Sequence, residues 1–136
     1  MGMTIITSDE KMTVDIGGAD IWNSLKSTVE TRLGSLKSDI SKAVNFLNTG
    51  KCNAKNGLET ARQFNIIRDE FAKLSVEEIV YDANDPEMEV PWKNNISPTI
   101  TSCANFYTTS DGKDLLCEIV SILCYAQSNN VSIEII

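Results

Sequence analysis

The chain contains no histidine among its 136 residues, and its four cysteines form no C-x-x-C pair. Histidine and paired cysteines are the usual ligands of zinc, so we expect no metal site. Histidine is also the commonest general base and the usual activator of a serine or cysteine nucleophile, so its absence makes catalysis less expected. Carboxylate pairs can do acid and base chemistry without histidine, which keeps an enzyme among the alternatives.

The sequence also lacks any apolar run near the roughly 20 residues that span a bilayer. Its amino-terminal stretch, MGMTIITSDEKMTVDIGG, lacks the basic segment followed by an apolar one that marks a signal peptide. We therefore expect a cytoplasmic protein with no membrane partner. Reduced thiols fit that compartment, and small buried apolar side chains are the expected role of Cys117 and Cys124. The other two cysteines are Cys52 and Cys103.

Basic residues are in the minority, with 12 Lys and Arg against 19 Asp and Glu and a net charge of −7. Nucleic-acid-binding domains need clustered Lys and Arg, so we expect no nucleic-acid partner. The acids gather between residues 77 and 89, without any Lys or Arg, as Glu77, Glu78, Asp82, Asp85, Glu87 and Glu89. This segment is either a solvated loop that aids solubility or a docking face for a basic partner.

The residues that are present predict a packed core, because 42% are hydrophobic and 23% are charged. A chain of this length suits a single domain, residues 1–136. Apolar spacing of three and four residues predicts helices at 20–33, about 36–48, about 53–74 and about 113–128. Runs of β-branched and aromatic residues predict strands at 4–7, 12–16, 78–81, 105–108 and 131–135.

These elements predict an α+β fold, in which a mostly antiparallel sheet of about four to five short strands packs against about four helices. The last helix has the broadest apolar face and is expected to be central. Asp20 and Asn53 are the expected caps at the starts of the first and third helices. Gly34 and Gly50 are the expected ends of the first and second.

The stretch TTSDGKDLL, residues 108–116, has the look of a ligand site. A Walker phosphate loop would need glycine and a hydroxyl residue where Tyr107 and Asp114 stand. A calcium loop would need alternating oxygen ligands after Asp111, which are missing. We therefore expect a strand-to-helix corner, in which Ser110 or Asp111 caps the helix and Asp114 favours its positive end.

Several segments, read together, resemble one family of bacterial immunity proteins from polymorphic-toxin systems, catalogued as immunity protein seventy. The segments are EEIVYDANDPE (77–87), PWKNNISPTIT (91–101), NFYTTSDGKDL (105–115) and YAQSNNVSIEI (125–135). Their order and spacing carry the resemblance, which covers most of the chain from about Asp15 onward.

The resemblance implies a non-enzymatic cytoplasmic protein, without a cofactor, that binds and occludes a cognate toxin domain delivered between competing bacteria. An acidic inhibitor suggests that this carboxy-terminal toxin domain is basic, and a nuclease is the best guess. The candidate contacts are Asp82, Asp85, Glu87, Glu89 and Trp92. Trp92 either packs into the core beneath the proline-rich loop or serves as an exposed anchor.

Two other functions stay open at this point. The corner of residues 108–115 could belong to a small-ligand or nucleotide-binding module. Asp111 and Asp114, spaced by one helical turn, could serve as the acid and base of a histidine-free enzyme.

Overall fold

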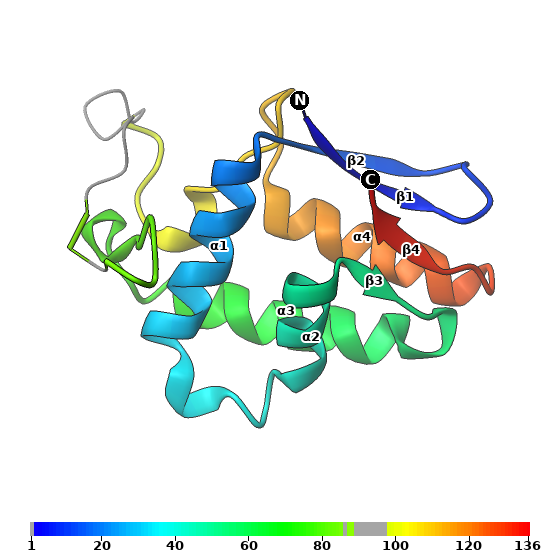
Figure 1. Ribbon diagram of the computed structural model, residues 1–136, viewed down its shortest axis with the longest axis horizontal. Helices are drawn as coiled ribbons and strands as arrows, with labels where there is room; N and C mark the ends of the chain where they lie inside the picture. The colour runs from blue at the N-terminus through cyan, green and yellow to red at the C-terminus, as the bar shows by residue number, and fades with distance from the viewer. Residues whose placement is uncertain (1, 86, 89–97) are drawn as a thin grey trace.

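Four short strands form one antiparallel sheet in the computed structural model, which describes residues 2–85, 87–88 and 98–136. The strand order is β2-β1-β4-β3, so β1 and β4 are central (Figure 1). The strands are β1 (Met3–Thr7), β2 (Thr13–Gly17), β3 (Lys51–Cys52) and β4 (Ile133–Ile135). Alternate residues such as Ile5 and Val14 face the core, while Thr13 and Glu134 face solvent, as a half-buried sheet requires.

In the described part of the chain, four α-helices cover the inner face of the sheet and each other. They are α1 (Ala19–Arg32), α2 (Ser41–Thr49), α3 (Gly57–Phe71) and α4 (Leu115–Ser128). Helix α4 lies between the sheet and α3 and contacts both (Figure 1). Its buried side chains include Leu116, Ile119 and Leu123. The predicted α+β class and the predicted central helix are therefore confirmed.

Two of the predicted strands are wrong. Residues 78–81 overlap the end of a 3-10 turn, η3 (Val76–Glu78), and form no strand. Residues 105–108 overlap another turn, η5 (Cys103–Asn105), and reach only an isolated bridge between Thr108 and Asp114. Both segments bury apolar side chains. Apolar and β-branched residues indicate that one side of a segment is buried, but they do not specify a strand for it to pair with.

Several boundaries also differ from the prediction. Helix α1 is preceded by Gly18, so Asp20 is not the N-cap; it lies in the first turn, where its Oδ1 accepts a hydrogen bond from the Ile21 N–H at 3.0 Å. A 3-10 turn, η1 (Gly34–Leu36), delays the start of α2 to Ser41. Asn53 precedes a further 3-10 turn, η2 (Ala54–Asn56), and makes no side-chain cap bond. Gly50 ends α2 at φ 70°, as predicted, because the left-handed conformation favours glycine.

Candidate functional site

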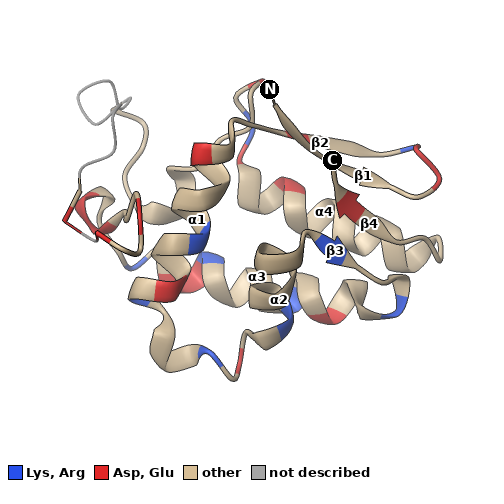
Figure 2. Ribbon diagram, in the orientation of Figure 1, with Lys and Arg blue, Asp and Glu red and all other residues tan. Residues whose placement is uncertain are grey.

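The acidic segment forms an arm beside α1, which we define as residues 77–85 with 87 and 88. Figure 2 shows its carboxylates gathered on this side of the molecule. Glu77, Asp85 and Glu87 are exposed, and Asp82 is half-buried. The predicted contacts Glu89 and Trp92 lie outside the described residues. The structure thus presents three of the five candidate contacts, Asp82, Asp85 and Glu87, on one segment.

The base of the arm is fixed to α1 by a buried network of hydroxyl groups. The Tyr107 hydroxyl lies 3.0 Å from Ser24 Oγ and 2.8 Å from Thr28 Oγ1. Ser24 Oγ donates to the carbonyl oxygen of Val80 at 2.8 Å, and the Val80 N–H donates to Thr28 Oγ1 at 2.9 Å. All four residues are fully buried. Two side chains of a helix therefore replace the strand partner that Val80 lacks.

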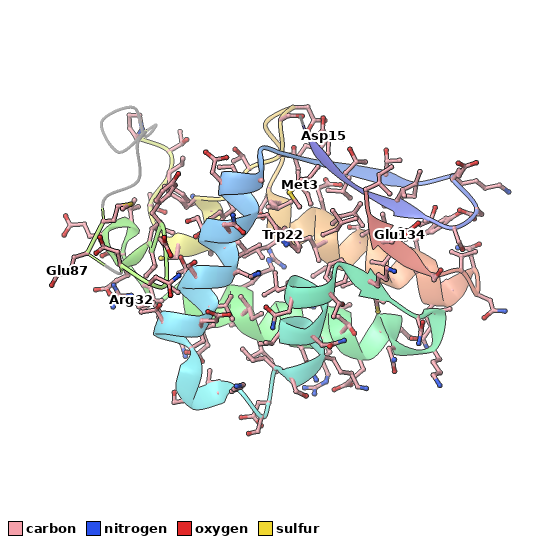
Figure 3. The ribbon with its side chains drawn as sticks, in the orientation of Figure 1. Met3, Asp15, Trp22, Arg32, Glu87 and Glu134 are labelled. Atoms are coloured by element: carbon pink, nitrogen blue, oxygen red, sulfur yellow. The ribbon has the colours of Figure 1, made fainter. Side chains whose placement is uncertain are left out.

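A second attachment lies one turn further along α1. Arg32 Nε donates to the carbonyl oxygen of Glu78 at 2.9 Å and lies 3.3 Å from Glu78 Oε2. In Figure 3, Arg32 projects from α1 toward the arm, and Glu87 lies at the outer side of the arm. The exposed ion pair contributes little stability by itself. Together with the buried network, it fixes where the arm leaves the core.

Cys103 and Tyr107 are buried at the base of the arm and are uncharged. Burial raises the pKa of the Cys103 thiol to about 12, and the nearby Glu78 adds to the rise. The thiol donates to the carbonyl oxygen of Ser75 at 3.3 Å. Burial also raises the pKa of Tyr107 well above its usual value, so its hydroxyl keeps its proton. The buried part of the base is therefore neutral and hydrogen-bonded, and the charged Arg32 and Glu78 lie outside it.

The outer part of the arm is a tight turn that carries an exposed apolar side chain. The Asp85 N–H donates to the Asp82 carbonyl oxygen at 3.0 Å, and the Asn84 N–H donates to Asp82 Oδ1 at 2.9 Å. The Met88 N–H then donates to the Asp85 carbonyl oxygen at 3.0 Å. Met88 is 44% exposed. Sequence reasoning missed this residue, although an apolar side chain between Glu87 and Glu89 could have marked it.

The corner at residues 108–114 is a closed turn, and its helix cap is Asp114. Asp114 accepts a hydrogen bond from the Cys117 N–H at 3.1 Å. The prediction that Ser110 or Asp111 caps the helix is wrong, because α4 begins only at Leu115. Asp111 instead accepts a bond from the Thr109 hydroxyl, which lowers the pKa of its carboxyl.

The same corner covers the outer edge of β2. The Ser110 N–H donates to the Asp15 carbonyl oxygen at 3.3 Å, and the Ser110 hydroxyl donates to the Asp15 carboxylate. Gly112 permits the turn with φ 84°. The polar groups that made the stretch resemble a ligand site thus form hydrogen bonds that close the corner and cover a sheet edge.

The described part of the chain contains no group of three or more metal-ligating side chains. No helix in the same part is both long and apolar enough to cross a membrane. All four cysteines are free; Cys103 is buried, while Cys117 and Cys124, expected to be buried, are half-buried. The arm, with its exposed carboxylates, remains the candidate site.

Comparisons with known proteins agree with a binding role. Neither the curated proteins nor the solved structures give a match to this chain. A family model described as Immunity protein 70 matches residues 7–135, nearly the whole chain, so the chain belongs to this family of immunity proteins.

Proposed function

We propose that this immunity protein neutralises its cognate toxin by occlusion, with the acidic arm as the docking face. One observation carries the proposal. The arm holds five described carboxylates, and its base is attached to α1 through buried hydrogen bonds at Val80. A fixed charged surface binds with less ordering cost than a loose one. The proposal needs no chemical step by this chain, because covering the toxin's working surface is enough.

The charge of the arm suits a basic toxin domain. Clustered carboxylates raise the rate of encounter with a positively charged partner and disfavour acidic ones. A nuclease is the partner class that fits best, since nucleases carry basic surfaces to hold phosphates. Such a toxin would meet this protein in the cytoplasm, where its substrate lies.

Charge alone does not hold a tight complex, so an apolar anchor is also needed. Met88 supplies one within the arm, because its flexible thioether can adapt to a pocket on the partner. Trp92, four positions along the chain, is the second proposed anchor. Buried anchors surrounded by polar contacts are the usual source of binding energy at interfaces.

The test is the association rate with the cognate toxin domain. The triple variant Asp85→Lys, Glu87→Lys and Glu89→Lys should slow association by about tenfold or more and flatten its dependence on salt. Co-expression of this variant with the toxin should rescue growth less well than the wild type does.

A matched control reverses three exposed carboxylates on other elements, Glu10, Asp39 and Glu134, with the same change in net charge. This control should keep most of the rate and its salt dependence. Equal slowing by both triples would mean that net charge, and not the arm, steers the toxin. An unchanged rate in the arm variant would reject the docking face.

The alternative of a small-ligand module at the corner is less well supported. The carboxylates of Asp111 and Asp114 already accept hydrogen bonds within the corner, and Ser110 is bound to Asp15. These same bonds give Asp111 and Asp114 structural roles, so the observations favour neither the ligand module nor the histidine-free enzyme.

A further inference from the structure

A polar trough lies on the other side of α1 from the acidic arm, where α2 faces β3 and η2 (Figure 1). Its volume is about 440 Å³. One wall is a face of α2 that includes Lys42, Asn45 and Thr49. The opposite wall is the chain from Lys51 to Asn56. The volume falls in the range of roughly 300–1,000 Å³ that is usual for small-molecule sites.

The charge of the trough is opposite to that of the protein. Its ten lining residues include two lysines, Lys42 and Lys51, and no carboxylate, although the chain has a net charge of −7. Neither lysine forms an ion pair with any residue that the structure describes. The nearest carboxylates, Glu59 beside Lys42 and Glu134, the cross-strand neighbour of Lys51, lie outside this lining, so the charge within the trough itself is positive.

Side chains, and not a helix end, supply the hydrogen-bond donors. The backbone N–H groups of Lys42 and Ala43 are already bound to Gln63 Oε1 at 2.7 and 3.0 Å. Lys42 Nζ reaches across the trough to Asn56 Oδ1 at 3.4 Å. The side-chain amides of Asn45 and Asn53 make no hydrogen bond within the described residues. Ammonium and amide donors thus line both walls.

We propose that this trough binds the phosphate group of a small phosphorylated molecule. Two ammonium groups match the double charge of a phosphate monoester, and lysine binds phosphate as a point charge. A planar carboxylate is better matched by the arginine fork, which the lining lacks. The asparagine amides add donors for the remaining phosphate oxygens and for the polar body of the ligand.

The experiment measures binding of inorganic phosphate and of AMP by calorimetry, at an ionic strength held constant with chloride. We expect saturable binding at one site, with AMP the tighter ligand, and amide shift changes on α2 and β3 in NMR spectra. The pair Lys42→Gln and Lys51→Gln should raise the Kd for AMP at least about tenfold, because charged hydrogen bonds are lost.

The control pair is Lys11→Gln and Lys37→Gln, which removes the same charge from exposed positions outside the trough. It should change the Kd by less than about twofold, because distant surface charges are screened. Absence of saturable binding, equal weakening by both pairs, or binding of citrate as tight as that of phosphate would overturn the proposal. No toxin is used, so the result is independent of the proposed immunity interface.

Discussion

The hydroxyl of Tyr107 is the meeting point of three parts of the chain that lie far apart in sequence. It links α1 to the base of the arm through Ser24 and Thr28. A buried network of this kind costs stability when any member loses its partner, and the cost depends on which polar group is left unpaired. The hydrogen bonds therefore predict which substitution lowers the free energy of unfolding more.

Tyr107→Phe should lower the free energy of unfolding by about 1 kcal/mol, because Ser24 and Thr28 keep other partners. Thr28→Val should cost more, about 1–3 kcal/mol, because it leaves the buried Val80 N–H without an acceptor. Urea unfolding of both variants measures the difference. A smaller loss for Thr28→Val than for Tyr107→Phe would contradict this account of the network.

Asp114→Ala should cost about 1 kcal/mol, because the first turn of α4 loses its cap. Asp114→Asn should recover most of that loss, since asparagine also caps well. Asp111→Ala should cost less than Asp114→Ala, because Asp111 bonds only within the exposed corner. Thermal unfolding monitored by circular dichroism gives the order, and equal losses at the two positions would disagree with the structure.

At the scale of elements, the contact between α3 and α4 depends on Gly57. A Cβ atom added there would lie 2.5 Å from the Leu123 carbonyl oxygen and 3.0 Å from Gln127 Cβ. The two helices therefore approach more closely at this point than any side chain would allow. The Leu58 N–H, one residue later, donates to Gln127 Oε1 at 2.7 Å across the same contact.

Gly57→Ala should push α3 away from α4 and lower the free energy of unfolding by about 1–3 kcal/mol. Gly34→Ala is the matched control, because its added Cβ would meet no atom within 4 Å. That control should be neutral or slightly stabilising. Chemical denaturation of the two variants measures both effects, and similar stabilities would show that the helices can separate without cost.

Periodic elements could be predicted from the sequence, and the arm could not. The apolar stripes of α3 and α4 specify long buried faces locally, although Leu58, at the start of α3, is 50% exposed. Val80 looked like part of a strand because it is apolar and β-branched. Its actual partners, Ser24 and Thr28, lie 56 and 52 residues away. No local pattern encodes a backbone segment that pairs with the side chains of a distant helix.

The candidate site, too, could be predicted only in part from the sequence. Charge clustering identified the acidic arm, because like charges in a short segment are visible in any sequence. The helix cap was placed too early, at Ser110 or Asp111, since the corner continues to Asp114 before α4 begins. The trough was missed entirely, because its lysines and asparagines come from α2, β3 and η2 and carry no motif.

At the scale of the whole molecule, the arm carries a cluster of carboxylates, while acidic and basic residues are interspersed over the other elements (Figure 2). Two buried groups at the base of the arm also make the free energy of unfolding depend on pH. Cys103 and Tyr107 both have a raised pKa in the folded protein, while the unfolded chain releases these protons near the ordinary values of 9.0 and 10.0.

Stability should therefore be unaffected by these two groups below about pH 8.5 and should fall as the pH rises above about 9. The unfolded chain then loses protons that the folded protein retains, which favours unfolding. Urea unfolding at intervals from pH 7 to 10.5 measures the slope. Cys103→Ala should reduce the slope between pH 9 and 10, and an unchanged slope would mean that other groups cause the loss.

The pairing of β1 with β4 has a consequence for synthesis. Ile5 lies opposite Ile135, so the β1–β4 pair at the centre of the sheet can form only after β4 has been synthesised. The β1–β2 hairpin is local in sequence and can form earlier. Under the proposed function, antidote molecules that have not yet paired β1 with β4 would give no protection, so the rate of this long-range pairing would matter as well as the affinity of the complex.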